Sequence, residues 1–296
     1  MRETTLALVL LTAAAPAPAQ DFYGHWADGR AELSGYQVVQ PRYGEPREGH
    51  AVLVFVTEDV HAGTLIKVES PDTPKSDRIY ALKLNRMLRF TTGIYDYSMM
   101  TSVFSAVEPR AGGRSFEPLR ITFTAQEWCG HVFEEVQVRG GAVLGELFSY
   151  FERVGRQSWR LDRPPELVSE DNLLIRIREL RGPLMEEGES RGVMLLPGLW
   201  ELRLRHRPRE LVEAVLSKGR REPVVVQGRS REAVPWTWSY GQRRKTVWVD
   251  TEYPHRILRW QDSSGASGEL LASVRRPYWN LQSLDDEAFR AELGIP

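Results

Sequence analysis

The sequence predicts a mainly β protein whose antiparallel sheet is strongly curved or nearly closed, like a half-barrel. Apolar and polar residues alternate in several segments, and short clusters of glycine, proline and serine separate them. Alternation with a period of two is typical of strands with one buried face, and short turns favour antiparallel neighbours. The chain also contains nine Trp, ten Tyr and ten Phe. Each buried aromatic side chain removes roughly 150–250 Å² from water, so these residues can supply a core.

The expected strands follow from this pattern in chain order. Residues 50–57 form a continuous apolar run, which predicts a central strand. Alternation predicts further strands around residues 80–84, 119–124 and 200–205. Turn-forming residues separate the predicted strands at 71–74, 111–113, 139–141, 197–198 and 263–265.

Two helices are expected. The first helix is expected over 165–181. Pro164-Pro165 marks its start, acidic residues are frequent in its first part, and Gly182-Pro183 ends it. This is the one helix that we expect to pack on the sheet, although alternation over 175–178 also fits a strand. The second is a short C-terminal helix over 285–293.

Composition places limits on the organisation and the partners. The chain of 296 residues has 39 Lys and Arg against 40 Asp and Glu, so its formal net charge is -1. It lacks the basic excess that binding to a nucleic-acid backbone requires, so no nucleic-acid partner is expected. We expect one β-rich domain over 20–296, with a weak subdivision near 181–192. Its apolar runs are too short for an integral membrane span.

The N-terminal segment predicts export. Residues 1–19 contain Arg2, a short apolar stretch and the small residues of 17–19, which together are typical of a Sec-type signal peptide. We expect cleavage after Ala19 and a periplasmic or secreted protein. Because the chain has one cysteine, Cys129, it forms no internal disulfide.

The densest cluster of reactive residue types lies at 127–131. On a continuous strand, Glu127, Cys129 and His131 would share one face, with Trp128 on the other. A thiol beside an imidazole and a carboxylate could act as a nucleophile or hold a metal. Alternate residues on a strand lie roughly 6.6 Å apart along the chain, which is too far for a nucleophile–base hydrogen bond without a bulge. The favoured interpretation is therefore a buried, structural Cys129.

Other clusters suggest ligand binding. Tyr95, Tyr97 and Met99 would line one strand face, where aromatic and thioether groups suit an apolar ligand, although core packing is the more common role. A turn at Arg42 and Tyr43 could hold an anion or form a solvated hairpin tip. Late in the chain, Trp and Tyr residues at 236, 238 and 240 indicate packing on a sheet. The candidate ligand-binding residues are Arg42, Tyr43, Tyr95, Tyr97, Met99 and Trp128.

Several short segments resemble a group of exported bacterial proteins that often carry the label "septum formation inhibitor Maf". The resemblance covers about residues 25–152. It implies an exported protein without the α/β fold of the cytoplasmic Maf nucleotide pyrophosphatases, and it implies no catalytic residue. At the level of the fold, the chain also resembles the half-barrels of periplasmic lipoprotein carriers. The matching segments are 42–45, 47–49, 54–59, 82–85, 92–95, 97–101, 127–131 and 149–152.

These observations lead to three functional hypotheses. The first is a non-enzymatic exported protein that binds an apolar or amphipathic molecule, such as a lipid, within the curved sheet. The second is a hydrolase or transferase that uses Cys129 and His131, and the third is a structural or assembly factor of the cell envelope. We expect no metal and no cofactor.

Overall fold

The computed structural model describes residues 22–110 and 113–296, and this part of the chain is mainly β, with 55% strand and 13% helix. The predicted fold class is therefore confirmed. The strands are β1 (Ala31–Arg42), β2 (Glu45–His61), β3 (Arg78–Thr92), β4 (Tyr95–Ala106), β5 (Glu117–Glu127), β6 (Gly130–Arg139), β7 (Ala142–Ser149), β8 (Arg156–Asp162), β9 (Leu167–Ser169), β10 (Ser190–Leu196), β11 (Val212–Lys218), β12 (Glu222–Val226), β13 (Arg229–Tyr240), β14 (Arg243–Asp250), β15 (Ile257–Asp262) and β16 (Ser267–Arg276).

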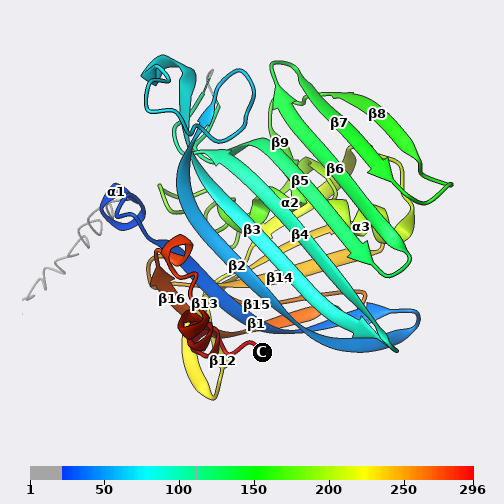
Figure 1. The fold of residues 1–296 in the computed structure, drawn as a ribbon, viewed down its shortest axis with the longest axis vertical. Helices are drawn as coiled ribbons and strands as arrows, with labels where there is room; N and C mark the ends of the chain where they lie inside the picture. The colour runs from blue at the N-terminus through cyan, green and yellow to red at the C-terminus, as the bar shows by residue number, and fades with distance from the viewer. Residues whose placement is uncertain (1–21, 111–112) are drawn as a thin grey trace, which may run out of the picture.

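Within the described residues, all sixteen strands belong to one sheet that is not closed into a barrel. The strand order is β8-β7-β6-β5-β4-β3-β2-β1-β16-β15-β14-β13-β11-β10-β9, and β12 pairs with β13 outside this path. Neighbours are antiparallel, apart from the parallel pair β9–β10. The first and last strands, β1 and β16, meet in the middle of the sheet. In Figure 1 the strands of the first half lie in front of those of the second half.

The long strand β2 contains the predicted central segment. It pairs with β1 on one side and β3 on the other, and residues 51–56 are largely buried. A strand that is covered by side chains on both faces has a continuous apolar sequence, so this segment could be predicted as a central strand.

The helices differ from the prediction in length and position. The predicted helix over 165–181 is shorter, because Leu167–Ser169 forms β9 and α2 spans only Glu170–Arg176. All the residues of α2 are buried, and it packs against β4, β5 and β9. The C-terminal segment forms the 3₁₀ helix η3, which starts at Leu284 and has a capping box between Ser283 and Asp286. This helix covers Leu284–Leu293. Three other short helices are α1 (Phe22–Trp26), η1 (Lys75–Asp77) and η2 (Tyr278–Asn280).

The predicted strand over 200–205 is wrong. The segment forms the helix α3, Leu199–Arg205, although apolar and polar residues alternate along it. Its start is fixed by acidic side chains of α2, which accept hydrogen bonds from the first backbone N–H groups of the turn. This tertiary capping, from residues nearly thirty positions away in the sequence, outweighs the local pattern.

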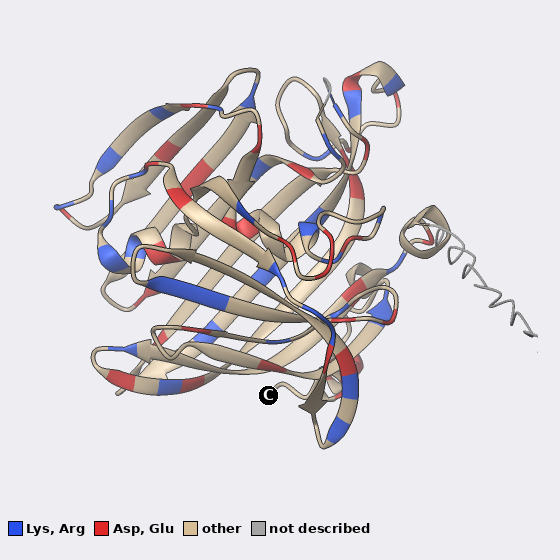
Figure 2. Ribbon diagram, turned by 180° about the vertical axis from the view of Figure 1, so that it is seen from behind, with Lys and Arg blue, Asp and Glu red and all other residues tan. Residues whose placement is uncertain are grey.

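The main core fills the space between the two halves of the sheet. It includes alternate residues of β2 to β5, the apolar residues Leu173, Leu174 and Ile175 of α2, and the aromatic residues of β13. Trp236 and Trp238 are fully buried, so the predicted sheet-packing ladder is confirmed. Acidic and basic residues are interspersed over the ribbon in Figure 2.

Two predictions on chain organisation stay predictions. The proposed signal peptide, residues 1–19, lies outside the described residues, and the division into one or two domains is not decided by the sheet. Within residues 22–110 and 113–296, no helix combines the length and apolarity needed to cross a bilayer.

Candidate functional site

A charged residue interrupts the apolar inner face of β3. Alternate residues of this strand belong to the core, and they read Leu82, Leu84, Arg86, Leu88 and Phe90. The four apolar side chains are buried, with exposed fractions of 6% or less. Because alternate residues share a face, Arg86 points into the concave interior with them.

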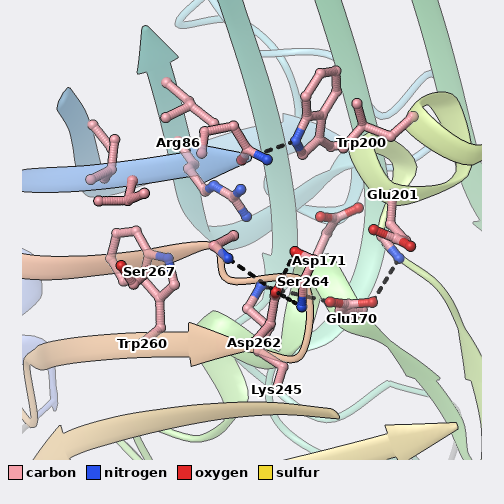
Figure 3. Close-up of a pocket in the computed structure, with 18 of the residues that line it drawn as sticks. Arg86, Glu170, Asp171, Trp200, Glu201, Lys245, Trp260, Asp262, Ser264 and Ser267 are labelled. Carbon is pink, nitrogen blue, oxygen red and sulfur yellow. Dashed lines mark hydrogen bonds and ion pairs between the residues drawn. The ribbon is translucent and has the colours of Figure 1, made fainter. Parts of the chain in front are cut away.

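Arg86 lines a polar cavity of about 50 Å³ between β3, α2, α3 and the strands β14 to β16. This volume holds roughly three or four water molecules. Trp200 and Trp260, both half-buried, also line it. Figure 3 shows the Arg86 side chain directed into the pocket, with Asp171, Glu170 and Lys245 on its far side.

The two acidic residues at the start of α2 are both buried, yet they differ in their electrostatics. Oε2 of Glu170 accepts hydrogen bonds from the Gly198 N–H and the Tyr240 hydroxyl, each at 3.1 Å. Burial raises the pKa of Glu170, but Lys245 and these hydrogen bonds outweigh burial, and the net pKa is lowered. Burial dominates for Asp171, and its pKa is raised to about 6 although its Oδ2 accepts the Leu199 N–H at 3.0 Å.

The other charged groups of the cavity are also engaged. Arg243 lies 2.9 Å from Glu201 and 3.2 Å from Asp262, measured between its Nη2 and the carboxylate oxygens. Nζ of Lys245 lies 3.6 Å from Glu170. Among the described residues Arg86 has neither a hydrogen bond nor an ion pair, so its guanidinium donors remain available inside the cavity.

Predicted ligand-binding residues meet at a different place, the tips of the hairpins β1–β2, β3–β4 and β5–β6. The guanidinium of Arg42 packs on the ring of Tyr43, 4.2 Å from its centroid, and donates to the Tyr97 hydroxyl at 3.2 Å. The hydroxyls of Tyr43 and Tyr97 lie 2.8 Å apart. Burial raises the pKa of Tyr97, and the hydrogen bond with Tyr43 adds to this. The turn at Arg42 and Tyr43 is the tip of the β1–β2 hairpin, because Arg42 pairs with Glu45. That this turn holds an anion stays a prediction.

The remaining candidates divide between surface and core. Met99 is buried in the main core, as expected for packing. Tyr95 is half-buried, and its ring centroid lies 6.4 Å from that of the exposed Trp128. A cavity of about 10 Å³ lies beneath the tips, and Trp200 and Leu204 of α3 line both this space and the larger polar cavity. Helix α3 thus separates the two.

The prediction that Cys129 is buried is wrong, because Cys129 is exposed. The segment is not a continuous strand: Glu127 pairs with Gly130, so Trp128 and Cys129 form the turn between β5 and β6. A turn at the end of a hairpin projects its side chains into solvent. His131 is also exposed, and no hydrogen bond links it to Cys129 in the part of the chain described here. This part also contains no grouping of three His, Cys, Asp or Glu side chains suited to a metal ion.

Sequence reasoning missed the polar cavity. Its signal was present in the alternation of β3, where one arginine replaces an expected apolar residue. The acidic residues of α2 looked like ordinary helix-start residues. Their convergence with Lys245 and Arg243 depends on the pairing of distant strands.

No protein-family model, curated protein or solved structure matches this chain. The resemblance to the exported bacterial group and the fold-level resemblance to lipoprotein carriers therefore stay predictions.

Proposed function

We propose that this chain is an exported, non-enzymatic protein that binds an amphipathic anion inside its curved sheet. Arg86 binds the acidic head of this ligand, and Trp200 and Trp260 contact its apolar part. The observation that carries the proposal is the free guanidinium of Arg86 on an otherwise apolar strand face, beside a cavity. Arg86 is half-buried, and a guanidinium partly removed from water without an ion pair among the described residues favours an anionic ligand.

The neighbouring acids leave the donors of Arg86 without a direct partner, although the charge of Arg86 acts on Asp171 at longer range and lowers its pKa against the larger effect of burial. Every carboxylate around the cavity already accepts a hydrogen bond or ion pair from the protein, as described above for Glu170, Asp171, Glu201 and Asp262. A carboxylate, sulfonate or phosphate can take two parallel hydrogen bonds from one guanidinium, which favours such a head group at Arg86.

Size restricts what lies in the interior. Pockets for complete drug-sized ligands usually measure about 300–1,000 Å³, whereas this cavity measures about 50 Å³. The head group alone fits the cavity in this conformation. The apolar part of the ligand therefore lies along the half-buried indoles toward Ser264, in the turn between β15 and β16, and Ser267, at the start of β16, which also line the cavity.

A pair of related dyes provides the test. 8-Anilinonaphthalene-1-sulfonate carries an anionic head on an aromatic body, and N-phenyl-1-naphthylamine is its uncharged counterpart. A charged hydrogen bond contributes about 1.5–3 kcal/mol, so Arg86→Gln should weaken binding of the sulfonate by about tenfold or more. Binding of the uncharged dye should not change.

The matched control is Arg89→Gln, which removes an exposed arginine from the opposite face of the same strand. It should leave both affinities unchanged. Equal sulfonate binding by the Arg86→Gln variant and the unmodified protein would refute the proposed site. Native mass spectrometry of protein purified from its own envelope fraction would identify the natural ligand. N-terminal sequencing of the same sample tests export, with a mature start expected at or near Gln20.

A further inference from the structure

We infer that the hairpin tips at one end of the sheet form a docking surface for an anionic lipid bilayer. The surface, called here the tip patch, consists of Tyr43, Ile94, Trp128 and Tyr150. Each of these residues lies in the connection of a different hairpin: β1–β2, β3–β4, β5–β6 and β7–β8. Figure 1 shows the four connections at the same edge of the sheet, on the right of the view.

The tip patch is unusually exposed for such large apolar side chains. The exposed fractions are 58% for Tyr43, 82% for Ile94, 70% for Trp128 and 75% for Tyr150. Isolated exposed apolar residues are common on proteins, but a row of four on successive hairpins at one edge indicates an interaction surface. The apolar surface continues onto the outer face of the sheet through Phe133 and Phe148, which lie opposite each other on β6 and β7.

The spacing of the tip patch favours a broad, planar partner. Successive hairpins are two strands apart, or about 10 Å, so the four tips extend over about 30 Å. A protein partner usually receives its anchors in packed pockets near the centre of an interface. A bilayer surface instead accepts separate side chains along a line, and Trp and Tyr favour its interfacial region because their rings are apolar with a polar group.

The balance of unpaired charges at this end of the sheet favours an anionic bilayer. Four arginines at this end of the sheet have no ion-pair partner among the described residues: Arg42, Arg153, Arg156 and Arg203. The field of Arg203, Arg153 and Arg42 lowers the pKa of His206, in addition to the effect of burial. Figure 2 shows basic segments at this edge, on the left of the view. Three carboxylates without ion pairs among the described residues, Asp96, Glu127 and Glu152, offset most of this charge and leave an excess of one positive charge.

The arginines are also placed for an interfacial role. The guanidinium of Arg42 lies over Tyr43, that of Arg203 over Phe151 at 4.7 Å, and that of Arg156 over Phe148 at 4.9 Å. Each pair holds a cation against an aromatic ring. At a membrane, the exposed ring of Tyr43 enters the acyl boundary while the guanidinium of Arg42 stays at the level of the lipid phosphates.

Vesicle binding tests this inference without reference to the dye-binding site. The protein should cosediment with vesicles of equal parts phosphatidylglycerol and phosphatidylcholine, and much less with phosphatidylcholine alone. Combining Trp128→Ser with Tyr150→Ser should reduce the partition coefficient about tenfold or more. Combining Arg153→Gln with Arg156→Gln should reduce it by a similar factor on the anionic vesicles only.

Matched controls come from exposed residues outside the tip patch. Val225→Ser with Leu284→Ser removes two exposed apolar side chains, and Arg220→Gln with Arg229→Gln removes two exposed arginines. Neither pair should change vesicle binding. The Arg86→Gln variant should also bind vesicles normally, so failure of one proposal does not imply failure of the other.

The position of Cys129 provides a direct readout, because this exposed thiol lies in the same turn as Trp128. A polarity-sensitive fluorophore on Cys129 should shift to shorter wavelength when anionic vesicles are added. Absence of cosedimentation and of a shift would overturn the inference. Equal binding by the tip-patch variants and the unmodified protein would also overturn it, as would equal binding to both lipid compositions.

Discussion

Nη2 of Arg178 lies 2.9 Å from Oε2 of Glu32, and both side chains are completely buried. The pair joins the segment after α2 to the central strand β1. Arg178 also donates to the backbone oxygen atoms of Pro254 and His255, and its guanidinium lies 4.2 Å from the ring centroid of Phe55. One residue thus connects α2, both halves of the sheet and the core.

Breaking this pair should be strongly destabilising. Arg178→Met leaves the Glu32 carboxylate buried without its main partner, so the free energy of unfolding should fall by about 3–5 kcal/mol. Urea unfolding measures the loss. Arg276→Met is the control, because it disrupts the exposed pair with Glu292 and should cost no more than about 1 kcal/mol. A similar loss in both variants would contradict the assigned role of Arg178.

The second prediction concerns Asp171 and pH. Its folded-state pKa is raised from 3.8 to about 6, so the folded protein retains a proton there that the unfolded chain releases. The resulting stabilisation is fully present below about pH 4 and is lost as the pH rises through about 6. A pKa difference of this size corresponds to about 3 kcal/mol of unfolding free energy.

Comparison with Asp171→Asn isolates this effect. The difference in unfolding free energy, unmodified protein minus variant, should decrease as the pH rises from about 4 to about 7. For the exposed control Asp72→Asn, the difference in unfolding free energy from the unmodified protein should stay constant over the same pH range. A constant difference for Asp171→Asn would mean that this carboxyl titrates normally.

The third prediction concerns the cysteine. Because Cys129 is exposed, iodoacetamide should label the native protein about as fast as the unfolded protein. Cys129→Ser should change stability by less than about 0.5 kcal/mol, as for other surface substitutions. His131→Ala should leave the labelling rate unchanged, since no hydrogen bond links the two residues in the described chain. A large decrease in the labelling rate of Cys129 in the His131→Ala variant would instead support a thiol–imidazole pair.

Two glycines give a fourth prediction that separates stability from ligand binding. A Cβ at Gly268 would lie 2.1 Å from the ring of Trp260, and one at Gly145 would lie 1.9 Å from the ring of Trp159. Each Gly→Ala variant should lose about 1–3 kcal/mol because an indole must move. Only Gly268→Ala should weaken binding of the sulfonate dye, because Trp260 lines the polar cavity. Equal dye binding by both variants would exclude Trp260 from the site.

Much of the fold could be predicted because strands with one buried face have a local signature. The central position of β2 and the packing of Trp236 and Trp238 follow directly from apolar patterning. The segment 200–205 shows where this reasoning fails. Its alternation suggested a strand, but capping by the carboxylates of α2 makes it helical, and that contact depends on tertiary structure.

The site was less predictable for a related reason. Hairpin register decides whether a residue lies on a strand or in a turn, and the turn at Trp128 and Cys129 reversed the expected burial of the thiol. Arg86 could have been selected from sequence as the odd residue in an apolar row. Its lack of a partner, in the described part of the chain, emerges only when the carboxylates of other elements are placed around it.

The pairing of β1 with β16 has a consequence for folding kinetics. Ala31 lies opposite Arg276, so this contact closes a loop of most of the chain. Contacts between residues that are distant in sequence form slowly, since chain entropy must be lost before they stabilise the protein. During synthesis from the N-terminus, the hairpins of β1 to β8 can assemble while β1 still has an unpaired edge. This edge, like the outer edge of β8, can pair with another chain, and its exposure ends when β16 is synthesised and pairs with β1.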